Sequence, residues 1–534
     1  MRNGHGSRFI GATVETPNSK NATDISALLD EAARLLFANK WQRAERHLRK
    51  VLKADPGNAQ ALHLTGVARH RAGKPKQARR FVERAVKAAP HDAAFHVTLA
   101  QILDETDDLP AAAVSYERAI ALDPLDSETY FELAGAWKRL GHLEAAIDCY
   151  EKALEIAPND APTLYNLANT LKSADRLEGA VEAYRLAIVA QPDFVPVYKN
   201  LGVTLKELGQ TDEAFDILRA GASIMFAPET LSDEELRIPL RTSNAKLQHD
   251  SEQIQYLIDR DRISKQYGDD ATVYQEIRAG APKERAATDS FQLPPDEQQK
   301  IARTYNRLIY LNDGSRCEGA AVSPRLDARS IEQDYHTNTP EITYFDDFLT
   351  PEALRRLREF CLESTIWYTR YENGYLGAVL GDGFASPLLA QIVDELPQAL
   401  PSIFGDLKLN QAWAFKYDSE LTGINLHADF AAVNVNFWIT PDDAVEDPDT
   451  GGLVVWDKEA PLDWNFEKYN ADEAAMRQFL EENDARAVRI PYRQNRALVF
   501  NSDLFHETDR IAFRPGYENR RINITLLYGD RRDA

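Results

Sequence analysis

A spacing of 34 residues organises the N-terminal part of this chain. Three columns of residues repeat with it: a proline, an alanine, and a position that holds only alanine or glycine. They are Pro56, Pro90, Pro124, Pro158 and Pro192; Ala44, Ala78, Ala112, Ala146, Ala180 and Ala214; and Ala32, Gly66, Ala100, Ala134, Ala168 and Gly202. Apolar residues between these columns recur at helical spacing, so each unit predicts two amphipathic helices, the second ended by the proline. The small residues mark places where two helices approach closely.

A column of aromatic residues, Tyr116, Tyr150 and Tyr184, follows the same period and should pack between neighbouring helices. Over residues 25–228 the pattern resembles six tetratricopeptide repeats. The resemblance implies a right-handed superhelix whose concave face holds a peptide or protein partner. The periodicity by itself indicates only stacked helix pairs. A spacer or a homodimerisation surface is the alternative role, because a fold does not fix a function.

A chain of 534 residues is too long for one core and predicts several domains. Residues 1–24 are polar and are expected to be a flexible N-terminus. Residues 229–337 lose the period but keep segments that look helical: DEELRIPLR, EQIQYLIDRDRI and DEQQKIARTYNRLIYL. Loops are expected at Gly280, Pro282, Pro294 and Pro295, so this stretch predicts a helical connector. Residues 338–534 form the C-terminal domain.

Composition narrows the class of partner and the compartment. The formal net charge of −22 disfavours a nucleic-acid partner, because it would repel a phosphate backbone. Three widely separated cysteines give neither a disulfide framework nor a CxxC motif, which favours a reducing compartment. With neither a signal peptide nor a long apolar run in the sequence, we expect a cytoplasmic protein without membrane association.

Short apolar alternations replace the helical pattern in the C-terminal domain. They read ITYF, QAWAFKY, VNVNFWIT, LVVWD, RALVF and RINITLLYG, and each predicts a β-strand. Helices are expected at TPEALRRLREFCLES and ADEAAMRQFLEEN. Many short strands with few helices favour a sandwich or jelly roll.

Two histidines and an aspartate in this domain form a candidate metal site. His427 and Asp429 are two residues apart, and on an extended strand they would face the same side. His506, which follows a later strand, would supply the third ligand. Two histidines and one carboxylate leave open positions on an iron(II) ion, as in non-haem oxygenases. The spacing alone is weak, because His142 and Glu144 show it inside a helical repeat.

A cation is expected near such a site to bind the distal carboxylate of a 2-oxo acid. Arg521 in RRINITLLYG is the candidate, on one strand face with Asn523 and Thr525, while Arg520 should point the other way. A structural salt bridge is the alternative role for Arg521.

The segments FKYDSELTGINLHADF, GGLVVWD, RALVFNSDLFHE and RRINITLLYG together resemble the prolyl-hydroxylase-like branch of the 2-oxoglutarate/Fe(II) oxygenases over about residues 340–530. The resemblance implies a double-stranded β-helix (jelly roll). It also implies His427, Asp429 and His506 as the catalytic iron ligands and Arg521 as the 2-oxoglutarate anchor. Tyr417, Asn436 and Asn523 would be further cosubstrate contacts. Arginine stands where many prolyl hydroxylases have lysine, so proline is not fixed as the target.

The activity implied is a dioxygenase reaction in which O2 and 2-oxoglutarate are consumed, succinate and CO2 are released, and a C–H bond is hydroxylated. The substrate would be a peptide or protein side chain presented by the repeats. Two alternatives stay open: a small-molecule or carrier-tethered substrate, with the repeats used for docking or oligomerisation, and a scaffold whose barrel is not catalytic. The enlarged segment 457–495 between the ligands is expected to be a lid, a substrate wall or a surface excursion.

Overall fold

The computed structural model describes residues 19–228, 238, 240–280, 290–371, 373–418 and 423–531. Contacts divide the chain into two units, one ending at Gln191 and one beginning at Pro192. Among the described residues, no helix has both the length and the apolar character that crossing a membrane requires.

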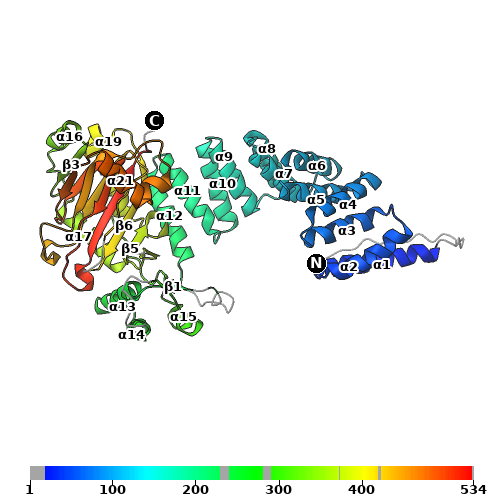
Figure 1. Ribbon diagram of the computed structural model, residues 1–534, viewed down its shortest axis with the longest axis horizontal. Helices are drawn as coiled ribbons and strands as arrows, with labels where there is room; N and C mark the ends of the chain where they lie inside the picture. The colour runs from blue at the N-terminus through cyan, green and yellow to red at the C-terminus, as the bar shows by residue number, and fades with distance from the viewer. Residues whose placement is uncertain are drawn as a thin grey trace. The chain divides into compact units, whose positions relative to one another are not determined.

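The first unit is an array of helix pairs, blue to cyan in Figure 1. Its helices are α1 (Ser19–Phe37), α2 (Trp41–Ala54), α3 (Ala59–Arg71), α4 (Pro75–Ala88), α5 (Ala93–Glu105), α6 (Leu109–Leu122), α7 (Ser127–Arg139), α8 (Leu143–Ile156), α9 (Ala161–Ser173) and α10 (Leu177–Ala190). Helix α1 begins inside the segment 1–24 that the sequence predicts to be flexible, and residues 1–18 of that segment lie outside the described part of the chain.

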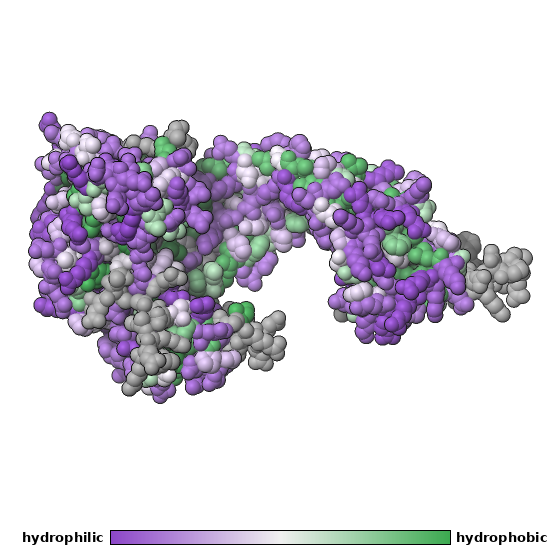
Figure 2. Space-filling view, viewed as in Figure 1, coloured by the Kyte–Doolittle hydropathy of each residue, from purple (hydrophilic) through white to green (hydrophobic). Residues whose placement is uncertain are grey.

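The columns of the repeat have the packing roles that the sequence predicts. Every alanine of the second column is fully buried, and the three column tyrosines are at most 2% exposed. A Cβ on Gly66 would lie 2.3 Å from Cγ2 of Val82, so a larger residue would separate α3 from α4. The polar sides of the helices remain outside: in Figure 2 the visible face of this array is mostly hydrophilic, with separate apolar patches.

The sixth helix pair, α11 (Val195–Glu207) and α12 (Thr211–Met225), belongs to the second unit. Its second helix, α12, contacts α18 (Pro387–Ala399) of the same unit. Lys199 Nζ lies 3.4 Å from Asp382 Oδ1, and Arg219 donates to the carbonyl of Asp313. The sequence period therefore continues across a structural boundary.

The second unit contains antiparallel sheets. The seven-stranded sheet has the order β3-β10-β7-β12-β6-β5-β4, and the three-stranded sheet has the order β11-β8-β9. The strands are β3 (Ile342–Phe345), β4 (Thr369–Arg370), β5 (Leu376–Val379), β6 (Leu409–Tyr417), β7 (Val433–Trp438), β8 (Leu453–Glu459), β9 (Ala487–Ile490), β10 (Ala497–Asn501), β11 (Leu504–Thr508) and β12 (Arg521–Tyr528). One apolar cluster, which includes Tyr417, Trp438, Val455 and Leu504, joins the two sheets. The predicted strands are confirmed, whereas the jelly-roll connection stays a prediction.

Helices flank these sheets: α16 (Ala328–Thr337), α17 (Pro351–Glu363), α19 (Pro401–Phe404), α20 (Phe466–Asn470) and α21 (Glu473–Glu482), with α18. The connector contributes α13 (Asn244–Asp259), α14 (Gly268–Gly280), α15 (Pro295–Ile301) and the short pair β1 (Arg241–Thr242) with β2 (Phe291–Gln292). The helix expected through DEQQKIARTYNRLIYL is shorter than predicted, because it ends at Ile301. Most of the expected helix DEELRIPLR lies outside the described residues.

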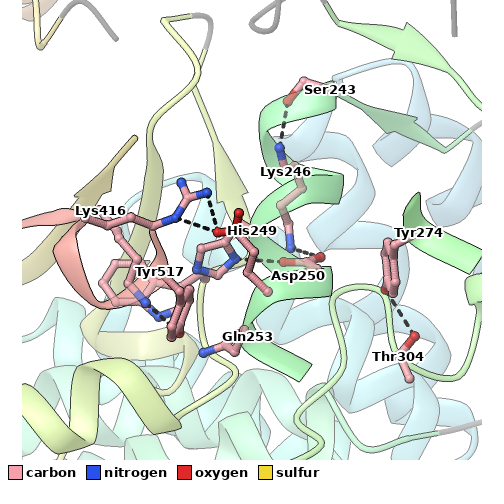
Figure 3. A network of polar contacts seen from close by, with 12 residues as sticks. Ser243, Lys246, His249, Asp250, Gln253, Tyr274, Thr304, Lys416 and Tyr517 are labelled. Atoms are coloured by element: carbon pink, nitrogen blue, oxygen red, sulfur yellow. Dashed lines mark hydrogen bonds and ion pairs between the residues drawn. The ribbon is translucent and has the colours of Figure 1, made fainter. Parts of the chain in front are cut away.

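A buried polar network fixes the connector to the outer face of the seven-stranded sheet (Figure 3). On α13, Lys246 Nζ lies 2.5 Å from Asp250 Oδ2, and His249 Nδ1 lies 3.0 Å from Asp250 Oδ1. On β6, Lys416 Nζ donates to the hydroxyl of Tyr517 at 3.0 Å and stands 4.2 Å from the ring centre of Trp367. Hydrogen bonds cross from α13 to the sheet and to the end of α17: Arg520, directly before β12, pairs with Glu252 at 2.8 Å, and Gln253 Nε2 donates to the carbonyl oxygens of Leu362 and Ser364 at 3.1 and 2.9 Å. These bonds specify how α13 seats on the sheet.

Acid should destabilise the protein through His249. Burial, with the charges of Lys416 and Arg520, holds the pKa of His249 well below its ordinary value of 6.5. The folded protein keeps the ring neutral, while the unfolded chain protonates it below about pH 6.5. Below that pH, the free energy of unfolding therefore falls by about 1.4 kcal/mol for each unit by which the pH is lowered. Thermal unfolding from pH 7.5 to 5.5 should show a shallower pH dependence in His249→Phe than in the wild type. His336→Phe, at an exposed histidine, is the matched control; equal slopes for His249→Phe and wild type would contradict the prediction.

Candidate metal centre and adjoining cleft

His427, Asp429 and His506 meet at one point in the second unit. Their ligand atoms all lie within 4.8 Å of one another, the only such group of three among the described residues. Asp429 Oδ1 is 3.8 Å from His427 Nε2, and Asp429 Oδ2 is 3.5 Å from His506 Nε2. Both Asp429 and His506 are 3% exposed, so the cluster differs from a chance group of surface carboxylates.

The local backbone differs from the extended strand that the sequence predicts for His427 and Asp429. His506 lies on β11, but His427 makes only an isolated antiparallel bridge to it. The two residues exchange main-chain hydrogen bonds, His427 N to His506 O at 3.0 Å and His506 N to His427 O at 2.8 Å. This bridge, rather than a continuous strand, brings the two imidazoles together, with ring centres 4.2 Å apart.

Both imidazoles are oriented by main-chain carbonyls. Nδ1 of His427 lies 2.8 Å from Asn425 O, and Nδ1 of His506 lies 3.0 Å from Leu504 O. A proton on Nδ1 is therefore hydrogen-bonded, which leaves Nε2 with a lone pair directed at the shared point. This is the arrangement in which a second hydrogen bond fixes the tautomer of a metal-binding histidine.

The electrostatics of the cluster suit a cation. Burial and the neighbouring His506 lower the pKa of His427 to about 4, against the opposing charge of Asp429. Burial raises the pKa of Asp429, but His506, His427 and the amide of Asn434 outweigh it, and the net pKa is lowered. At neutral pH the site therefore offers a neutral His427 ring and a carboxylate.

A chain of amide side chains runs inward from Asp429. Asn434 Nδ2 donates to Asp429 Oδ2 at 2.5 Å, and Asn436 Nδ2 donates to Asn434 Oδ1 at 2.6 Å. Asn436 Oδ1 then accepts from Asn523 Nδ2 and from Thr525 Oγ1, each at 2.8 Å. The structure thus places Asn436 and Asn523 in one network with the candidate metal ligand. Their predicted contact with a cosubstrate stays a prediction.

Arg521 is the first residue of β12 and lies on the strand face that also carries Asn523 and Thr525; it is 1% exposed. In the antiparallel register it stands opposite Tyr417, and its guanidinium carbon is 4.8 Å from the Tyr417 ring centre. Its Nε donates to Gly451 O at 2.6 Å and its Nη2 to Gly452 O at 3.4 Å, whereas Nη1 has no hydrogen-bond partner among the residues that the structure describes. Within the described chain no carboxylate forms an ion pair with it, so the alternative of a structural salt bridge finds no support.

Burial makes the charged form of Arg521 less favourable than it is in water. Burial lowers its pKa, and the nearby Tyr417 and Tyr492 offset part of that effect. Its neighbour Arg520 points to the opposite face, as predicted, and is paired there with Glu252 at 2.8 Å and Asp418 at 3.3 Å. A buried arginine with a spare donor is uncommon, since buried charges are normally paired.

A cleft of about 510 Å³ opens beside His427 and Asp429. Aromatic rings from the turn between β4 and β5, from β6, from the ligand segment and from the inserted segment dominate its lining. These are Tyr371, Tyr375, Trp413, Phe415, Phe430 and Phe466. The segment 457–495 contributes Phe466, Asn470 and Glu473, so it forms one wall of the cleft, and Tyr469 beneath it is a packing residue, 5% exposed.

Several residues of this site are not identified from the sequence. Asn434, which donates to the carboxylate of Asp429, lies two positions before Asn436 in VNVNFWIT. Two asparagines at alternate positions of a strand face the same side, and this spacing could have identified Asn434. Gly451 and Gly452 receive Arg521, and a Cβ on Gly452 would lie 1.8 Å from the carbonyl oxygen of Ile490. The two consecutive glycines in GGLVVWD could have indicated this close approach of two backbone segments.

Comparisons with known proteins identify the N-terminal part. Three tetratricopeptide repeat profiles match residues 35–102, 127–160 and 149–182, so the N-terminal half carries a tetratricopeptide repeat array. No curated protein matches the sequence.

Similar solved structures cover about a third of the chain. A crystal structure of MamA is 24% identical and covers 30% of this chain and 94% of its own, with a TM-score of 0.30. That of YrrB, described as a TPR protein with an unusual peptide-binding site, is 24% identical and covers 34% and 93%, with a TM-score of 0.31. PilF of Pseudomonas aeruginosa is 20% identical and covers 38% and 91%, with a TM-score of 0.34.

Proposed function

We propose that this protein is an Fe(II)- and 2-oxoglutarate-dependent oxygenase that hydroxylates a peptide or protein side chain. The observation that carries the proposal is the coexistence, on one connected interior face, of a buried two-histidine, one-carboxylate cluster and a buried arginine with an unused donor. The cluster alone would also fit a structural metal site, and the arginine alone would also fit a simple anion site. Together they supply a cation site and an anion site in the same interior.

The donor set fits iron(II). His427, Asp429 and His506 would hold the ion through two Nε2 atoms and one carboxylate oxygen, a set that leaves positions open for cosubstrate and O2. The main-chain carbonyls behind Nδ1 of each histidine and the amide of Asn434 provide the outer hydrogen bonds that such ligands normally have.

Arg521 fits the distal carboxylate of 2-oxoglutarate. Its unpartnered Nη1 is the orphaned buried donor that a carboxylate would satisfy, and a charged hydrogen bond of this kind is among the stronger ones. Gly451 and Gly452 fix Nε and Nη2, so the guanidinium is oriented before the anion arrives. Tyr417 and Trp438 flank it with rings that exclude water.

When bound, iron supplies the activation of O2 that converts 2-oxoglutarate to succinate and CO2 and inserts the second oxygen atom into a C–H bond. The chain's own residues orient and enclose the reactants. Asp429 and the two histidines would hold the ion beside the aromatic cleft, whose walls would keep water from the reacting carbon.

The cleft lining favours a neutral group as the target. Its rings present apolar faces; of its two acidic residues, Asp429 belongs to the candidate metal set and Glu473 is paired with Arg477 at 2.6 Å. The repeat array supports a polypeptide as the carrier of that group, since such arrays bind peptides along an extended surface. A free small molecule is the second candidate, because the cleft volume also lies within the range of small-molecule sites.

Binding and turnover can be measured in sequence. Anaerobic titration of the full-length protein should show one Fe(II) per chain and then one 2-oxoglutarate, and admission of O2 should release succinate. Absence of Fe(II) binding would contradict the proposal. A peptide library that stimulates succinate release would support a polypeptide substrate, and stimulation that stays unchanged after removal of residues 1–191 would rule out presentation by those repeats.

A further inference from the structure

The inserted segment is hydrogen-bonded to the residue that separates two of the candidate ligands. Ala428 N donates to Tyr469 O at 2.9 Å, and Asn470 Nδ2 donates to Ala428 O at 3.0 Å. Both main-chain polar groups of Ala428 are therefore satisfied by the last two residues of α20. Because Ala428 stands between His427 and Asp429, the orientation of its two peptide planes sets the direction in which both ligands project.

Helix α20 is itself firmly anchored. Asn465 caps it by accepting from Lys468 N at 3.0 Å. The ring of Tyr469 lies under Arg531, whose guanidinium carbon is 4.2 Å from the ring centre, and Arg531 pairs with Asp503 at 2.5 Å. The segment thus has a fixed position from which to hold Ala428.

Asn470 has a second role in the geometry. It lines the cleft together with Phe466 and Glu473 while its amide holds the ligand segment. One side chain therefore touches both the space that a substrate would occupy and the backbone that carries His427 and Asp429. Instead of a strand ladder, the irregular backbone here has the bridge at His427 and the hydrogen bond from Asp429 N to Ser502 O at 3.1 Å.

We propose that Asn470 is a positioning residue for the iron ligands His427 and Asp429, and that the α20–α21 segment joins the wall of the cleft to the metal set. The inference rests on the proposed function, since it takes the three-residue cluster as an iron site. It assigns the insertion a structural task at the metal in addition to shaping the cleft. Outer hydrogen bonds of this type typically change metal affinity about 10- to 100-fold when they are lost.

The test is anaerobic Fe(II) titration of the full-length protein and of two variants, Asn470→Ala and Asn470→Leu. Leucine keeps most of the side-chain volume but cannot donate to Ala428 O. The matched control is Asn483→Ala, because Asn483 is exposed and its Nδ2 also donates to a main-chain carbonyl, that of Phe479 at 2.8 Å. We expect Fe(II) affinity to fall about 10- to 100-fold in both Asn470 variants and to stay unchanged in the control.

A second readout separates positioning from packing. The visible absorption of the Fe(II)–2-oxoglutarate complex reports the ligand field, and it should shift in both Asn470 variants while their thermal midpoints remain near that of Asn483→Ala. Wild-type affinity and an unshifted spectrum in Asn470→Leu would overturn the inference while leaving the proposed function intact. Failure of the wild type to bind Fe(II) would overturn both.

Discussion

Asp429→Ala abolishes stoichiometric Fe(II) binding: this is the largest effect that we expect from a single substitution in the protein. The carboxylate would be the one anionic ligand of the proposed set, and Asn434 and both histidines lie around it. Its loss should weaken Fe(II) at least about 100-fold, beyond the range for outer-shell changes. Anaerobic equilibrium titration measures it.

The matched control is Asp270→Asn, since Asp270 is also buried and acidic but lies in the connector, where it pairs with Arg303 at 2.8 Å. This variant should bind Fe(II) like the wild type, at some cost in stability. Asp429→Ala should keep its fold, because the substitution removes a carboxylate from between two histidines and leaves the apolar cluster that joins the two sheets unchanged. Undiminished Fe(II) binding in Asp429→Ala would contradict the assignment of the ligand.

Loss of 2-oxoglutarate binding in Arg521→Gln is the second large effect. Truncating one partner of a buried charge pair costs about 2 to 5 kcal/mol, which corresponds to roughly 30-fold to several thousand-fold in affinity. Isothermal titration of the Fe(II)-loaded protein with 2-oxoglutarate gives the value directly.

Arg520→Gln provides an internal comparison one residue away in the sequence. Arg520 is similarly buried but faces Glu252 and Asp418 on the outer side of the sheet. This substitution should lower stability and leave 2-oxoglutarate affinity in place. If both variants bound the cosubstrate like the wild type, Arg521 would not be the anchor.

The regular parts of this fold could be predicted because the spacing of residue types along a helix or strand indicates which of its faces is buried. The buried alanine and tyrosine columns follow the helical period, and strands such as VNVNFWIT alternate in the register that the structure shows. The face shared by Arg521, Asn523 and Thr525 follows from a period of two. In each case a local pattern is enough, since the neighbour along the period is also the neighbour in space.

The candidate site was predictable only in part, because its geometry depends on contacts between distant segments. The bridge between His427 and His506 joins residues 79 positions apart, and no local pattern encodes it. The link from Asn470 to Ala428 joins residues 42 positions apart, one of them in the inserted segment. The boundary after Gln191 is not visible in the sequence either, because the 34-residue spacing continues through it. The boundary depends instead on which surface α12 covers.

That boundary bears on how the end of the repeat array is covered. The free ends of a repeat array normally need a capping unit, because the last helix pair has no following neighbour. Here the outward side of α12 rests on α18, and Ala222 stands 3.9 Å from the Cβ position of Gly383. Within the second unit, the sheet domain therefore does for the helix pair α11–α12 what a capping unit does at the free end of an array.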